Sequence, residues 1–271
     1  MNFERRKQFM TGFLKLLNFG VLAAACVSGI CAESIHTAAY RNPTERYGHF
    51  ALGRPHEYAA LVVRTDTGQT HTWGLAEDEV FEDLTPRLVR FSSGGPVELL
   101  TIVSSRSVGS RLVVFGFAND RLSMLSQSKP VGAPMRWLNP VGVADLDGDG
   151  VPEVAAVVTP HVGGILTVYQ RRGQDLVALA ELPGFFNHRY GSPELAMSAA
   201  LNWGGSMRLL VPDIDRTTLR VIALRGGALT EQGQCVLRAP MTGTMRVQGD
   251  HVVVQTGAGL QSVAPKDCST Q

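Results

Sequence analysis

Residues 149–158 read Asp-Gly-Val-Pro-Glu-Val-Ala-Ala-Val-Val, a turn followed at once by an apolar run that is rich in valine. A short run of this kind, bounded by turn residues, predicts a β-strand. Pro152-Glu153-Val154 has a counterpart 55 residues earlier, Val97-Glu98-Leu99, and another 55 residues later, Met207-Arg208-Leu209. The paired turn residues Gly94-Gly95, Asp149-Gly150 and Gly204-Gly205 keep the same spacing. The chain therefore contains an internal repeat.

A repeat of this length with about four strands per unit is typical of β-propeller blades, because a blade cannot bury its two faces without neighbours. We expect an all-β fold, a β-propeller of four-stranded blades, five in number, with six or seven as alternatives. Weaker copies near residues 57–59 and 249–252 supply the outer units. The predicted blades cover residues 42–83, 84–130, 131–184, 185–238 and 239–271.

The last predicted blade has only three convincing strands. We expect the segment 34–40 to supply the fourth, so that pairing of the N- and C-terminal strands closes the ring and leaves no sheet edge exposed. A two-layer sandwich of antiparallel sheets remains the alternative, since short strands at regular spacing also describe sandwiches.

The first 32 residues resemble an export signal. Arg5, Arg6 and Lys7 precede an apolar stretch from Phe19 to Ile30, which is shorter than the roughly 20 residues of a membrane span. We expect cleavage near Ala32, a single domain over 33–271 with no transmembrane span, and a periplasmic or extracellular location. Lipidation at Cys26 is the minor alternative.

Charge and cysteine content narrow the function classes. The chain has 25 Lys and Arg against 24 Asp and Glu, so it lacks the basic surplus of nucleic-acid-binding proteins, and we expect no nucleic-acid partner. Cys235 and Cys268 are the cysteines that follow the predicted signal. An oxidising compartment permits a bridge between them, with two unpaired thiols as the alternative.

Residues 145–153, Asp-Leu-Asp-Gly-Asp-Gly-Val-Pro-Glu, predict a calcium loop. Alternate carboxylates of a tightly curled loop converge, and all-oxygen ligation suits calcium. The expected ligands are Asp145, Asp147, Asp149, the carbonyl of Val151 and the carboxylate of Glu153. An EF-hand is excluded, because it requires an acid at the twelfth position, where this chain has Ala156.

With strands on both sides, this loop resembles the FG-GAP or VCBS repeat of integrin-type propellers and bacterial exported proteins. Val141-Gly142 stands for the Phe-Gly pair of that family, and Val158-Thr159-Pro160 for its closing element. The resemblance implies a propeller with the metal loop between the first and second strands of a blade. The neighbouring copies of the loop have lost their acids, so we expect one calcium ion per chain.

The opposite face of the predicted ring carries loops rich in aromatic, arginine and histidine residues, a composition that suits a polar ligand or a peptide. The bland interpretation is that the aromatic residues pack between blades. The candidate residues of this ligand face are Arg46, Tyr47, Arg136, Trp137, His161, His188, Arg189 and Tyr190.

No nucleophile elbow, zinc-protease, phosphate-loop or dinucleotide motif occurs in the sequence. We therefore expect a monomeric binding or scaffold module, rather than an enzyme, that holds a protein, a glycan or an envelope component. One alternative is a hydrolase or lyase acting on a polar polymer, with His161, His188, Arg189 and Tyr190 around the central channel. Another is a purely structural part of an envelope assembly.

Overall fold

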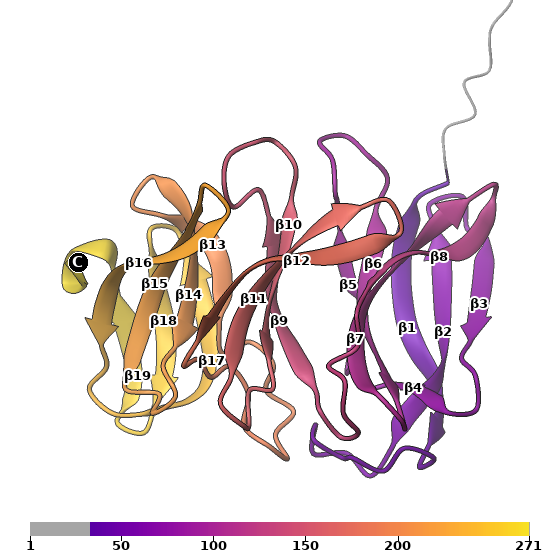
Figure 1. Ribbon diagram of the computed structural model, residues 1–271, viewed down its shortest axis with the longest axis horizontal. Coiled ribbons are helices and arrows are strands. Elements are labelled where there is room, and N and C mark those ends of the chain that lie inside the picture. Colours follow the sequence, from indigo (N-terminus) through magenta and orange to yellow (C-terminus); the bar gives the residue numbers. More distant parts are fainter. Residues whose placement is uncertain (1–32, 271) are drawn as a thin grey trace, which may run out of the picture. The chain divides into compact units, whose positions relative to one another are not determined.

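The computed structural model describes residues 33–270, and these residues form almost entirely antiparallel β-structure. The predicted signal segment, including Cys26, lies outside the described residues. Twenty strands and one short 3-10 turn, Pro265–Asp267, follow one another along the chain (Figure 1). Within this range no helix is long and apolar enough to cross a membrane.

Consecutive strands pair into five groups, which we number I to V. Group I contains β1 (Ile35–Thr44), β2 (Glu57–Thr65) and β3 (Thr70–Gly74). Group II contains β5 (Arg87–Val89), β6 (Glu98–Ser105), β7 (Gly109–Ala118) and β8 (Arg121–Ser128). The short strand β4 (Glu79–Phe81) pairs with both β2 and β6 and so joins these two groups.

Group III is a four-stranded meander of β9 (Leu138–Ala144), β10 (Glu153–Val158), β11 (Ile165–Arg172) and β12 (Asp175–Pro183). Group IV repeats it with β13 (Ala199–Trp203), β14 (Ser206–Pro212), β15 (Thr218–Arg225) and β16 (Ala228–Val236), to which β20 (Ser269–Thr270) adds a fifth strand. Group V has β17 (Met241–Gln248), β18 (His251–Thr256) and β19 (Gly259–Val263).

Hydrogen bonds connect groups I to III into one sheet of 12 strands, because β12 also pairs with β8. That contact is parallel and covers only two residue pairs, Asp175 with Gln127 and Leu176 with Ser128. Groups IV and V form separate sheets of five and three strands.

Four hydrophobic clusters lie between successive groups: one between I and II, one between II and III, one between III and IV, and one between IV and V. The alternation of side chains along a strand explains the pattern. On β10, Val154 and Ala156 face group II, whereas Ala155 and Val157 face group IV. Strands buried on both faces are continuous apolar runs, as the sequence shows at residues 154–158.

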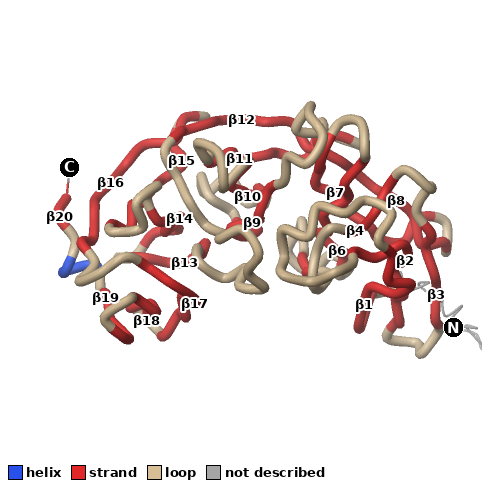
Figure 2. Tube along the Cα trace, turned by 90° about the horizontal axis from the view of Figure 1, so that it is seen from below, coloured by secondary structure: helices blue, strands red, loops and turns tan. Residues whose placement is uncertain are grey.

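The expected closure of the ring is wrong. The N-terminal segment 34–40 belongs to β1, which pairs along its length with β2 of group I, and the C-terminal strand β20 pairs with β16. Among the described residues no fifth cluster or strand pairing joins group V to group I, and Figure 2 shows the two groups at opposite ends of the row. The 12-residue connection 45–56 allows β1 to turn back onto β2, which is the nearest available edge.

Cys235 and Cys268 form a disulfide with an S–S distance of 2.02 Å. The bridge fastens the end of the chain to β16, beside the pairing of Gln234 with Ser269. All three strands of group V lie between the two cysteines in the sequence. The disulfide therefore ties down the one group whose single packed neighbour is group IV.

Candidate functional site

The acidic loop 145–152 connects β9 to β10 at the upper end of the sheets in Figure 1. Asp145, Asp147 and Asp149 each offer a carboxylate oxygen, and these three oxygens lie within 4.8 Å of one another. Positive φ angles at Gly148 (87°) and Gly150 (89°) allow the backbone to curl between them. The amides of Gly148 and Gly150 donate to the two oxygens of Asp145 at 2.8 and 3.0 Å. The loop thus holds three acidic groups together before any ligand is considered.

Glu153, the first residue of β10, is fully buried beneath this loop. Its Oε2 accepts a hydrogen bond from the amide of Leu146 at 2.9 Å, but its Oε1 is buried without a partner. Burial raises the pKa of Glu153 to about 7, against the Leu146 bond, and the three nearby aspartates raise it further. A buried carboxylate oxygen with no donor is costly unless a proton or a cation satisfies it.

The donor set is therefore all oxygen and strongly acidic, which fits a hard cation such as calcium. Asp145, Asp147, Asp149 and Glu153 would supply carboxylate oxygens. Val151, expected to contribute its carbonyl, is an exposed residue of the same loop, and its amide donates to Asp149 at 2.7 Å.

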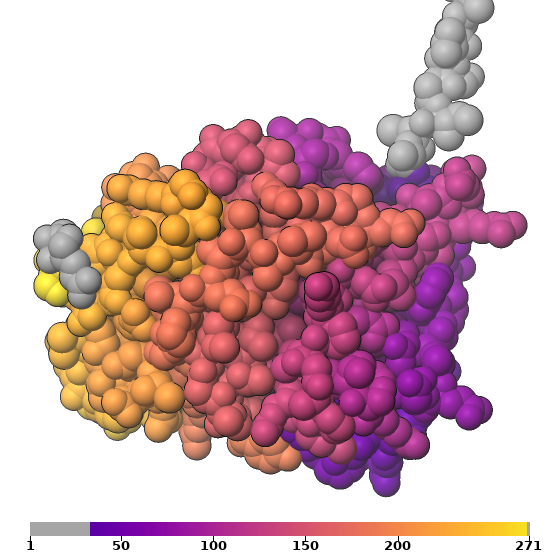
Figure 3. Space-filling view, viewed as in Figure 1, coloured from indigo at the N-terminus to yellow at the C-terminus, as the bar shows by residue number. Residues whose placement is uncertain are grey.

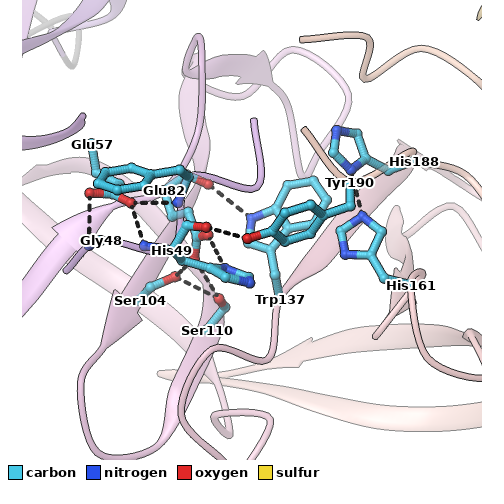
Figure 4. Close-up of polar contacts among 11 residues, drawn as sticks. Gly48, His49, Glu57, Glu82, Ser104, Ser110, Trp137, His161, His188 and Tyr190 are labelled. Atoms are coloured by element: carbon cyan, nitrogen blue, oxygen red, sulfur yellow. Dashed lines mark hydrogen bonds and ion pairs between the residues drawn. The ribbon is translucent and has the colours of Figure 1, made fainter. Parts of the chain in front are cut away.

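The expected ligand face is built by loops at the opposite end of β10. The β10–β11 loop carries His161, the β8–β9 connection carries Trp137, and the β12–β13 connection carries His188 and Tyr190. The structure brings these four side chains together (Figure 4). Trp137 lies parallel to His161, with ring centroids 6.0 Å apart, and meets His188 edge-on at 4.7 Å.

The two histidines form a hydrogen-bonded chain whose proton positions follow from its last acceptor. His188 Nε2 lies 2.8 Å from the carbonyl oxygen of Ser192, so this nitrogen carries a proton. In a neutral ring, His188 Nδ1 then accepts from His161 Nε2, which lies 2.8 Å away. Burial lowers the pKa of both His161 and His188 to about 4, and both rings are neutral at pH 7.

A second polar group lies beside the first and centres on Glu82, which is 1% exposed. His49 Nδ1 lies 2.5 Å from Glu82 Oε1, and the Ser104 hydroxyl donates to Glu82 Oε2 at 2.6 Å. The indole of Trp137 donates to the Glu82 carbonyl at 3.0 Å. Burial is the main cause of the raised pKa of Glu82, and the hydrogen bond from His49 opposes it.

Tyr190 links the two polar groups. Its hydroxyl donates to the carbonyl of His49 at 2.6 Å, and its ring meets those of His161 and His49 at 5.4 and 5.6 Å. The Gly191 amide adds a bond to the Ala51 carbonyl at 2.8 Å. The connection between β12 and β13 is therefore fastened to the connection between β1 and β2, which is 141 residues away in the sequence at the Tyr190–His49 contact.

The remaining candidates of the ligand face do not join this cluster through their charged ends. Arg46 donates from Nε to the Glu79 carbonyl at 2.9 Å. Arg136 and Arg189 are exposed, and neither forms a salt bridge with another residue of the range 33–270. Tyr47 is buried with its hydroxyl unpartnered, and burial raises its pKa.

Sequence reasoning missed the residues that complete the cluster. His49 follows Tyr47 closely in the sequence, but nothing local marks its pairing with Glu82, which is 33 residues away. Glu57, which accepts from the amides of His49 and Phe50 at 3.1 and 3.2 Å, likewise carries no sequence motif. The sequence matches no family model and no curated protein.

Proposed function

We propose that the protein is an exported, calcium-stabilised relative of the FG-GAP and VCBS propellers, and that it acts as a binding or scaffold module for a protein, a glycan or an envelope component. In this proposal groups I to V are the blades of a propeller-type array that β1 does not close. The single observation that carries the proposal is the buried, unpartnered Oε1 of Glu153 beside three convergent aspartates.

The arrangement of the sheets supports this proposal. Four clusters separate five groups, and each inner strand contributes side chains to the clusters on both of its faces. β6, β10 and β14 begin at residues 98, 153 and 206, in keeping with the repeat of the sequence. The disulfide is compatible with an oxidising compartment outside the cytoplasm.

Calcium would act as a structural ion at this site. When bound, it supplies positive charge that offsets the repulsion among Asp145, Asp147, Asp149 and Glu153. Glu153 begins β10, a strand buried between groups II and IV, so ordering of the loop is coupled to the centre of the row. The role in binding follows from rigidity, because the loops at the other end are held on a fixed framework.

Calorimetric titration of the purified, chelator-treated protein with calcium chloride tests the proposal. We expect one ion per chain and loss of binding in Asp147→Asn. The matched control is Asp120→Asn, which removes an exposed acid from the β7–β8 turn, outside the loop. The absence of calcium binding in the unaltered protein would overturn the proposal, and so would equal binding by both variants.

The second candidate function, a hydrolase or lyase acting on a polar polymer, is favoured by the pair of His49 and Glu82. A carboxylate that holds one ring nitrogen of a histidine leaves the other nitrogen to exchange protons with a substrate. His161 and His188 suit this function less well, because His188 is fully buried and engages both of its ring nitrogens internally.

An assay on polysaccharides and polyesters separates the two candidates. An enzyme would lose activity in His49→Gln and keep it in His56→Gln, whose imidazole lies 3.4 Å from the Tyr58 hydroxyl and not beside Glu82. The binding function predicts no turnover of these substrates by the unaltered protein.

A further inference from the structure

The outer strands β8 and β12 diverge after their two parallel residue pairs, and a hollow of about 360 Å³ opens beside this junction. Its lining residues are Gln127, Lys129, Tyr169, Asp175, Leu176 and Val177, together with Ala178. The hollow is far from the loops of the expected ligand face, since Gln127 and Asp175 belong to the outer strands of groups II and III. In Figure 3 the magenta atoms of group II and the salmon atoms of group III meet on the face that is shown.

The walls of this hollow are rigid. The Gln127 amide donates to the carbonyl of Gln174 at 3.0 Å, which fixes the two strands at their closest point. The Gln127 side-chain oxygen accepts from Arg111 Nε at 2.8 Å, and Arg111 in turn pairs with Glu79 at 2.7 Å. The orientation of the Gln127 side chain is therefore set, and its Nε2 is left as a donor.

The polar groups around the hollow are diverse and balanced. Lys129 and Asp175 are exposed and form no salt bridge within residues 33–270, with each other or with any other group. Arg111 is neutralised by Glu79, so the net charge around the hollow is close to zero. A cavity without net charge favours a neutral ligand, since an ionic ligand would leave one charge unmatched.

Hydroxyl groups add to this set. Tyr169 is 8% exposed, and burial raises its pKa to about 12, so its hydroxyl is neutral and both donates and accepts. Ser126 and Thr167 are each 1% exposed, and each has a hydroxyl without a hydrogen-bond partner. Ser126 pairs across the sheet with Val114, and Thr167 with Ala156, and both of these partners lie in the cluster between groups II and III. The two hydroxyls therefore face the same inter-sheet space as Tyr169 and Leu176.

We infer that this hollow is a binding site for a neutral, polyhydroxylated ligand of monosaccharide size, either free or at the end of a glycan. Such a ligand presents groups that both donate and accept, which matches Gln127, Lys129, Asp175 and the hydroxyls. Its carbon skeleton contacts Leu176, Val177 and Ala178. The volume lies at the lower end of the range for small-molecule sites. This inference deepens the proposed binding function by selecting a glycan over a protein.

Calorimetric titration of the protein, with calcium present, against glucose, galactose, mannose and N-acetylglucosamine tests the inference. Glucuronate and alanine serve as charged and zwitterionic comparators. We expect saturable binding of at least one neutral sugar, weakened at least tenfold in Tyr169→Phe, which removes only the hydroxyl. Tyr47→Phe is the matched control, since it removes another unpartnered buried hydroxyl from a different part of the chain.

A second variant, Ala178→Trp, fills the hollow from an exposed position of β12 and should abolish binding without disturbing the core. The inference is wrong if no neutral sugar binds, if only the charged comparators bind, or if Tyr169→Phe and Ala178→Trp bind as the unaltered protein does. Calcium binding by the same samples is measured separately, so a failure here is distinguished from a failure of the proposed calcium-dependent fold.

Discussion

Leu99 and Leu100 are consecutive residues of β6, yet their side chains lie in different hydrophobic clusters. Leu99 packs between groups I and II, and Leu100 packs between groups II and III. Each central strand is shared in this way between two cores. A group therefore has little stability by itself, and the row gains its stability from the contacts between neighbours.

Truncation of a shared core position should be costly. Leu100 is fully buried, and we expect Leu100→Ala to lower the free energy of unfolding by about 2 to 5 kcal/mol. Leu88→Ala is the control on the same group, since Leu88 is 52% exposed and its change should remain within about 0.5 kcal/mol. Denaturant unfolding of the two variants measures the difference, and equal effects would contradict the shared-core account.

The disulfide should stabilise the C-terminal groups. Cys235 and Cys268 close a loop across a separation of 33 residues, which by loop-closure entropy contributes about 3 to 4 kcal/mol. The Cys235→Ser, Cys268→Ser double variant should unfold at lower denaturant concentration, and limited proteolysis should cut first within residues 241–263. If the chain were cut first in group III instead, the disulfide would not be the element that secures group V.

Stability should fall as the pH drops below neutrality. Burial lowers the pKa of His161 and His188 to about 4 in the folded state, whereas an unfolded histidine titrates near 6.5. Because the unfolded chain binds protons first, the stability present above pH 6.5 is lost as the pH falls toward 4. We expect a loss of roughly 1 to 2 kcal/mol for the pair between pH 7 and pH 5.

Urea unfolding at the two pH values measures this loss. The His161→Gln, His188→Gln double variant should show a smaller difference between pH 7 and pH 5 than the unaltered protein. His36→Gln, which changes an exposed histidine of β1, should retain the full difference. An unchanged pH dependence in the double variant would show that other groups are responsible.

The strand content and the repeat follow from local sequence. Apolar runs such as residues 154–158 are readable because a strand that is buried on both faces needs apolar side chains at every position. The acidic loop is readable for a similar reason, since its three aspartates and two glycines are all within six residues, from Asp145 to Gly150.

Long-range relationships were less accessible. The segment 34–40 is compatible with any sheet edge, and its pairing with β2 depends on the connection 45–56 folding back rather than on a motif. The contact of His49 with Glu82, and that of Tyr190 with His49, depend on loops from different groups meeting at one end of the sheets. Trp137, His161, His188 and Tyr190 were found because the repeat register placed their loops at that end.

Thermal unfolding in calcium and in chelator, for the unaltered protein and for Asp147→Ala, tests the central claim most directly. A structural ion at about 100 times its dissociation constant adds about 2.7 kcal/mol, which raises the midpoint of unfolding by a few degrees in a domain of this size. We predict this shift for the unaltered protein and its loss in the variant. The same midpoint in calcium and in chelator for the unaltered protein would contradict the account, because Asp145, Asp147, Asp149 and Glu153 would then form an acidic turn without a structural ion.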